Sequence, residues 1–184
     1  MTHRKPVAAT SLGEDDAAAS PWALAEERLA NPEKGRTYWL ATVRADGRPH
    51  VMPLIGLWFE DAFYFLTGAG TRKGRNLAGD PHCVITAGST ALPSLDIIIE
   101  GDARKVTDET PLRRVTEAFG SRLEWPLEVR GDAVHGPNAP SAGPPPYSVF
   151  QVIPELVFGL PGMLGMDQFD PADLPRPTRW EFQP

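Results

Sequence analysis

The alternation of apolar and polar residues predicts a chain built mostly of β-strands that tight turns connect. Aromatic and β-branched residues gather in short runs, and turn pairs such as Asp46-Gly47 separate the early runs. Pro154 stands inside one of the later runs, which predicts a bulge or an edge strand at that point. The runs predict strands over residues 38–43, 51–59, 62–67, 82–88, 95–107, 148–161 and 178–182.

Three other segments carry helical periodicity or helix-start signals. They predict helices over about residues 21–31, 71–79 and 108–120, with Ser20 as the N-cap of the first. Because the strands follow one another as hairpins and do not alternate with helices, they favour an antiparallel barrel with helices packed outside it. The predicted fold class is therefore mainly β (α+β), with six or seven antiparallel strands.

Two segments lack a regular period. Residues 1–19 are polar and rich in alanine, so we expect a flexible tail before a single domain over residues 20–184. Residues 130–147 are rich in proline and glycine, which predicts a loop. The sequence leaves open whether this loop is a lid over an active site or an ordinary surface loop.

Charge and cysteine content narrow the range of partners. The 184 residues carry a net charge of -6, which disfavours binding to nucleic acid or to anionic lipid. No apolar run approaches about 20 residues and the N-terminus lacks a secretory pattern, so we expect no membrane partner and a cytoplasmic location. The one cysteine, Cys83, excludes an intrachain disulfide framework and a thiolate zinc cluster, and we predict no metal site.

One short basic segment contrasts with this acidic background. In "FLTGAGTRKGRN" two glycines lead into three cations, Arg72, Lys73 and Arg75, at the start of an expected helix. Cations at that end oppose the helix dipole, and flexible glycines let backbone amides turn toward an anion. A solvated helix face is the simpler alternative. The hydroxyls of Thr67 and Thr71 add donors, so the segment predicts a phosphate site at a helix N-terminus.

Two common phosphate-binding motifs do not fit this segment. A P-loop needs a Gly-Lys pair, and the chain has none. A dinucleotide fingerprint needs a third glycine where Lys73 stands and a βαβ unit around it, whereas the surrounding strands are expected to be hairpins. The phosphate should therefore belong to another class of ligand.

The residues around the basic segment resemble those of a known family. The stretches "YWLATVRADGRPHVMPLIGLWFEDAFYFLTGAGTRKGRNLAGDPHCVI", "DIIIEGDARKV" and "TRWEF" are similar to the pyridoxamine 5'-phosphate oxidase-like flavoproteins. These include the flavin/deazaflavin oxidoreductases abundant in actinobacteria. The resemblance covers residues 35–120 well and residues 147–182 more loosely. It implies a split β-barrel homodimer with two FMN molecules at the subunit interface.

The resemblance also implies roles for individual residues. In the family, the strand after the first hairpin, here residues 51–54, contacts the flavin ring largely through its backbone. Thr67 corresponds to a residue that reaches the phosphate or the ribityl chain, and the Thr-Arg-Lys triplet over residues 71–73 binds the phosphate. No catalytic residue is identified. The implied cofactor-binding residues are Val51, Met52, Pro53, Leu54, Thr67, Thr71, Arg72, Lys73 and Asp96.

Two positions depart from the biosynthetic oxidase. Asp96 stands where that enzyme carries a flavin-contacting glutamine, and a carboxylate cannot donate as an amide does. The C-terminal Arg-x-His pair that binds its substrate is also absent, since Arg179 is followed by Glu181. Oxidation of pyridoxamine phosphate itself is therefore not expected.

Three functional hypotheses remain open at this point. The first is an FMN-dependent oxidoreductase that transfers hydride to or from an unknown small molecule. The second keeps the fold but uses the 8-hydroxy-5-deazaflavin coenzyme, whose acidic tail would need a further cation such as Arg75. The third is a module that binds flavin or haem without catalysis.

Overall fold

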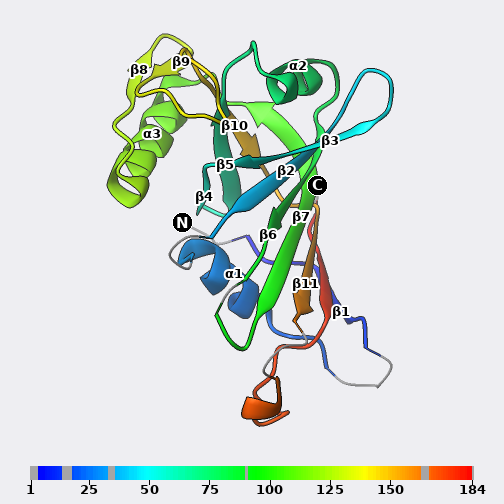
Figure 1. The fold of residues 1–184 in the computed structure, drawn as a ribbon. Helices are drawn as coiled ribbons and strands as arrows, with labels where there is room; N and C mark the ends of the chain where they lie inside the picture. Colours follow the sequence, from blue (N-terminus) through cyan, green and yellow to red (C-terminus); the bar gives the residue numbers. More distant parts are fainter. Residues whose placement is uncertain (1–3, 14–17, 33–35, 90, 163–165, 184) are drawn as a thin grey trace.

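The structure, a computed structural model, describes residues 4–13, 18–32, 36–89, 91–162 and 166–183. Within these ranges the chain is mostly antiparallel β-sheet with helices set against it (Figure 1). This arrangement confirms the predicted class of an antiparallel split β-barrel with flanking helices. The helices are α1 (Trp22–Ala30), α2 (Arg72–Gly79) and α3 (Glu109–Leu123), and a short 3-10 helix covers Met166–Gln168.

The described ranges contain more strands than the six or seven predicted, partly because two predicted strands are divided. The strand expected over 51–59 breaks at Ile55, and the strand expected over 148–161 breaks at residues 153–155. In chain order the strands are β1 (Ala8–Ser11), β2 (Tyr38–Val43), β3 (Pro49–Leu54), β4 (Gly56–Phe59), β5 (Ala62–Thr67), β6 (His82–Ala87), β7 (Leu95–Lys105), β8 (Glu128–Arg130), β9 (Ala133–His135), β10 (Ser148–Val152), β11 (Leu156–Pro161) and β12 (Thr178–Glu181).

The long strand β7 is the place where the sheet divides. One of its edges pairs with β6, and the other pairs first with β11 and then with β10. Gly101 lies at the division, where a Cβ would come within 2.5 Å of the Ile153 carbonyl oxygen. Pro154 follows in the break between β10 and β11, so the strand is divided at the residue where a bulge or an edge was predicted.

β5 lies between two hydrophobic cores, and all six of its residues are buried. Phe63 and Phe65 belong to the barrel core, which β2, β6, β7 and α1 complete. Tyr64 and Leu66 belong to a second core, where Phe119 of α3 packs against the other face of the strand. β5, the strand that leads into the basic segment, is therefore packed on both faces.

The N-terminal segment differs from the prediction. β1 lies inside the expected tail over residues 1–19 and pairs with β12, from Ala8 opposite Glu181 to Ser11 opposite Thr178. The tail prediction is therefore wrong for this strand. This four-residue segment becomes a strand because it pairs with the edge that β12 would otherwise leave open. β12 lies at the other end of the chain, so the pairing is not visible in the local sequence.

The start of α1 also differs from the prediction. The helix begins at Trp22, and the N-cap position is occupied by Pro21, which forms no side-chain cap hydrogen bond among the described residues. Ser20 instead ties the helix to the C-terminal segment, since its N–H donates to Thr178 Oγ1 at 2.9 Å and its Oγ accepts from the Arg176 N–H at 2.8 Å.

The region expected to be a loop, residues 130–147, contains one strand of the β8–β9 hairpin. Gly131 has a positive φ of 64° in the turn, a conformation that glycine adopts readily. The hairpin lies beside α3 (Figure 1).

Among the described helices, none is long and apolar enough to cross a membrane.

Candidate functional site

The Thr71 side chain organises the turn between β5 and α2. Thr71 is the N-cap of α2, because its Oγ1 accepts from the Gly74 N–H at 3.0 Å and donates to the Gly68 carbonyl at 2.9 Å. The hydroxyl of Thr67, which is fully buried at the end of β5, lies 2.7 Å from Thr71 Oγ1. Since Thr71 donates to Gly68, Thr67 is the donor in this pair. Both threonines therefore order the turn itself.

The first two amides of α2 have no protein acceptor among the described residues. The first four N–H groups of a helix lack intrahelical partners, and here Thr71 satisfies those of Gly74 and Arg75. The N–H groups of Arg72 and Lys73 remain, at the positive end of the helix dipole. The Arg72 side chain is exposed beside them, so this end of α2 has the features of an anion site.

Two residues outside the predicted set, Arg44 and His50, face the start of α2 from the β2–β3 hairpin. His50 pairs with Thr42 across the two strands, and Thr42 Oγ1 accepts from Asn76 Nδ2 of α2 at 2.9 Å. Side chains alternate along a strand, so Thr42, Arg44 and His50 share the face that lies against α2. The sequence shows these residue types but not the register that brings them to the helix.

Arg44, Arg72 and Lys73 form what we call the cationic cluster, and His50 lies beside them. Burial lowers the pKa of His50, and the positive charges of Arg44, Arg72 and Lys73 lower it further. In the part of the chain that the structure describes, no carboxylate forms an ion pair with any of these three cations. The Nε atom of Arg44 and the Nδ1 atom of His50 are also buried, and neither has a hydrogen-bond partner among the described residues. The cluster is thus an unbalanced positive charge in an acidic protein.

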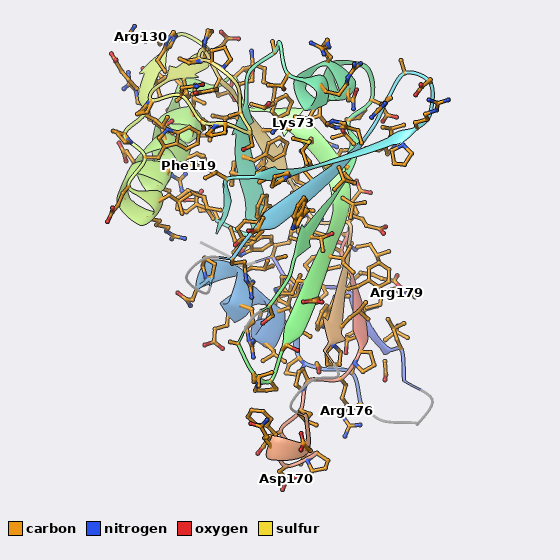
Figure 2. The ribbon with its side chains drawn as sticks, viewed as in Figure 1. Lys73, Phe119, Arg130, Asp170, Arg176 and Arg179 are labelled. Atoms are coloured by element: carbon orange, nitrogen blue, oxygen red, sulfur yellow. The ribbon has the colours of Figure 1, made fainter. Side chains whose placement is uncertain are left out.

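Lys73 is the most deeply buried member of the cluster, with 2% of its surface exposed. Its Nζ donates to the carbonyl of Ser141, and burial lowers its pKa. Figure 2 places Lys73 between α2 and the strands beneath it. The loop that carries Ser141 also accepts from the Gly68 N–H through the Ala142 carbonyl at 2.8 Å. The loop after β9 therefore covers the glycine turn of the candidate phosphate site.

The four predicted ring contacts lie on β3 and point alternately to its two faces. Val51 is 52% exposed on the outer face of the sheet, which Pro53 shares. Met52 and Leu54 follow the parity of His50 on the other face, and Leu54 is buried. Among the described strands β3 pairs with β2 alone, so the backbone of its second edge is open to a ligand.

A pocket of about 800 Å³ adjoins the end of β3 that is remote from His50. Leu54 and Gly56 line it together with the aromatic residues Tyr38 and Trp58. Burial raises the pKa of Tyr38, and the adjacent Arg36 guanidinium partly offsets this effect. Along β3, His50 and Leu54 are separated by roughly 13 Å. The cationic cluster and the pocket thus lie at opposite ends of one strand.

Asp96 is not brought to the other predicted contacts within one chain. It lies at the start of β7, and β6 and β2 stand between β7 and β3, a separation of roughly 14 Å across the sheet. Its Oδ1 accepts from the Ser89 N–H at 2.9 Å, which fixes the connection before β7.

Comparison with known proteins identifies the family. The family model for pyridoxamine 5'-phosphate oxidase matches residues 24–160. The chain belongs to this family. A pyridoxine/pyridoxamine 5'-phosphate oxidase from Burkholderia vietnamiensis is 31% identical over 170 residues, which cover 80% of this chain and 78% of that protein. The matched region contains the whole cationic cluster.

Solved structures with the same fold include proteins of several kinds. An FAD-binding protein from Mesorhizobium loti has a TM-score of 0.53 at 16% identity, covering 94% of this chain and 97% of its own. A heme binding protein from Mycobacterium smegmatis has a TM-score of 0.54 at 16% identity, with coverages of 80% and 57%. An F420 reductase has a TM-score of 0.50 at 22% identity, with coverages of 71% and 94%. At these identities the similarity shows that the oxidase family fold is shared.

Proposed function

We propose that this protein is an FMN-dependent oxidoreductase whose cationic cluster binds the terminal phosphate of the cofactor. The observation that carries the proposal is the gathering of Arg44, Arg72 and Lys73 without a carboxylate partner in the described chain. Together with the two free amides of α2, these groups match the charge and the hydrogen-bonding capacity of a phosphate. The resemblance of the Thr-Arg-Lys triplet to the family pattern supports the same assignment.

The layout of β3 supports a cofactor that extends along the strand. FMN is an elongated molecule, with its phosphate at one end and its flavin ring at the other. With the phosphate at the cluster, the ring would lie beside Met52 to Leu54, and a small-molecule substrate would enter from the pocket that Tyr38 and Gly56 line. When bound, FMN supplies hydride transfer. The protein orients the ring through the open edge of β3 and holds the phosphate.

A homodimer completes this proposal. Trp39 is 46% exposed and Val51 is 52% exposed on the outer face of the sheet, next to the predicted ring contacts. A two-fold interface would cover these exposed apolar side chains in both copies at once. The second copy would also bring its own Asp96, which lies on the same outer face, into the interface region.

The test of the phosphate assignment is FMN titration of an Arg72→Gln variant. Arg72 is exposed, so its replacement should leave the fold intact. A charge-assisted phosphate bond is worth about 1.5–3 kcal/mol, so the variant should bind FMN at least about tenfold more weakly than the wild type. Fluorescence quenching of FMN measures both dissociation constants.

Arg48→Gln is the matched control for this test. Arg48 lies on the β2–β3 hairpin, its side chain is 77% exposed, and it pairs with Asp46 outside the cluster. Its FMN affinity should stay within about twofold of the wild type. Equal weakening in both variants would indicate a non-specific charge effect, and unchanged affinity in Arg72→Gln would overturn the assignment.

A deazaflavin coenzyme is the second candidate, and the position of Arg75 favours it. Arg75 is exposed three positions after Arg72, and its guanidinium contacts only the Gly70 carbonyl among the described residues. It is therefore a spare cation for an acidic cofactor tail. Parallel titrations with the 8-hydroxy-5-deazaflavin coenzyme and with FMN separate these two candidates. A Soret band in the absorption spectrum of the purified protein would instead favour haem as the ligand.

A further inference from the structure

We infer that His50 is a further ligand of the anion at the start of α2, and that its imidazole takes up a proton when the anion binds. The inference rests on the proposed function, because it assigns a role at the same phosphate site. The contacts that the family resemblance implies are made by residues 51–54 of β3, Thr67, the Thr-Arg-Lys triplet and Asp96, and His50 is not among them. The inference rests on where the β2–β3 register places this side chain.

The position of His50 is fixed by the hydrogen bonds between the hairpin and α2. Thr42 Oγ1 donates to the His50 carbonyl at 3.4 Å and accepts from Asn76 Nδ2 at 2.9 Å, so His50 lies in the strand pair that docks on the helix. Its side chain shares the α2-facing side with Thr42, which is 2% exposed. His50 therefore lies on the face of the hairpin that contacts α2, within the electrostatic influence of Arg72 and Lys73.

The imidazole has an unused hydrogen-bonding atom at this position. His50 Nδ1 is buried and has no partner among the described residues, although buried polar atoms are usually paired. The buried Nε of Arg44 on the same face is also without a partner. These two side-chain atoms and the N–H groups of Arg72 and Lys73 have no partner among the described residues. Together they indicate a polar ligand that accepts hydrogen bonds from all four groups. A phosphate has enough oxygen atoms to do so.

The charges around His50 set the direction of proton transfer. Arg44 faces it from the hairpin, and Arg72 and Lys73 face it from α2; no carboxylate contributes to its environment among the described residues. Burial and these cations lower the pKa of His50, so the imidazole is neutral near pH 7 without the anion. A bound phosphate dianion would offset the cations and raise this pKa. Binding therefore takes up a proton from solvent, and affinity should fall as the pH rises between the free and bound pKa values.

The test is FMN affinity as a function of pH in the wild type and in His50→Gln. Glutamine keeps the size and polarity of the side chain but cannot be charged. At about pH 6 the variant should bind FMN about tenfold more weakly than the wild type, and at about pH 8 within about twofold. Because the FMN phosphate titrates equally in both proteins, the difference between the two profiles reports His50.

His82→Gln is the matched control. His82 is also a histidine near the basic segment, but its side chain is 77% exposed and its Nδ1 lies 2.6 Å from Asp80. This variant should keep the wild-type profile. As an independent readout, the His50 proton resonances of the wild type, assigned by their loss in His50→Gln, should titrate at higher pH when FMN is saturating. Riboflavin, which lacks the phosphate, should not produce this shift.

The outcomes separate the inference from the proposed function. If FMN binds and the His50→Gln profile superimposes on that of the wild type, or if the His50 resonances titrate at the same pH with and without FMN, the role of His50 is overturned while the phosphate site stands. If FMN does not bind the wild type at any pH, both proposals fail together.

Discussion

Lys73 exemplifies how single residues connect the fold of this protein to its proposed ligand. A buried ammonium group with one neutral carbonyl partner is costly, because desolvation is not offset by an opposite charge. Burial lowers the pKa of Lys73, in keeping with that cost. An anion at the start of α2 would supply the missing charge, so cofactor binding should stabilise the protein through this residue.

Replacing Lys73 with methionine tests this coupling at the residue scale. A ligand present at a hundredfold excess over its Kd stabilises the folded state by about 2.7 kcal/mol. Lys73→Met keeps the length of the side chain and removes its charge, so the same FMN concentration should stabilise the variant by less than half of the wild-type amount. Thermal unfolding with and without FMN measures both values. Equal stabilisation of the two proteins would contradict a role for Lys73 in binding the anion.

The division of the sheet along β7 is the main feature at the scale of elements. β11 and β10 pair with successive parts of the same β7 edge, and the chain crosses between them directly over Gly101. This close approach lets one sheet turn into a barrel on one side and extend to β12 and β1 on the other. The barrel half carries the hairpin that contacts α2.

Gly101→Ala should therefore destabilise the protein. The new Cβ would lie 2.5 Å from the Ile153 carbonyl oxygen, and this clash with a backbone atom cannot be relieved by side-chain rotation. We expect a loss of about 1–3 kcal/mol in the free energy of unfolding, measured by urea denaturation. Gly79→Ala is the control, because nothing lies within 4 Å of its Cβ position. A loss in Gly101→Ala no larger than that in the control would show that the crossing adapts.

Local signals predicted most of these elements, and tertiary pairing accounts for the exceptions. The helix predicted over about 71–79 is found over 72–79, and Thr71 directly before it is the N-cap, a signal that acts within a few residues. β1 could not be predicted, because its partner β12 lies about 170 positions away. For the site, the sequence singled out Arg72 and Lys73 but not Arg44, since only the strand register brings Arg44 to α2.

The outer face of the sheet is the dominant feature at the scale of the whole molecule. One row of paired residues runs across four strands, from Trp39 through Thr86 and Ile98 to Phe158. Trp39 lies in this row with 46% of its surface exposed. The barrel core is filled by the opposite side of the same strands, so the row is available to a second copy.

Trp39→Asp should convert the proposed dimer to a monomer. A carboxylate in the centre of an apolar interface would be buried without a partner in each copy. Light scattering at micromolar concentration should give twice the chain mass for the wild type and the chain mass for the variant. Val7→Asp is the control, since Val7 is 60% exposed but lies outside this row. A wild-type protein that is monomeric would remove the dimer from the proposed function.

The most direct test of the phosphate site is a comparison of FMN and riboflavin binding by the wild-type protein. The two molecules share the flavin ring and the ribityl chain and differ only in the phosphate. Since the cationic cluster is assigned to that phosphate, FMN should bind at least about tenfold more tightly than riboflavin in side-by-side fluorescence titrations. Equal affinities would mean that Arg44, Arg72 and Lys73 do not hold the cofactor phosphate, and would contradict the account.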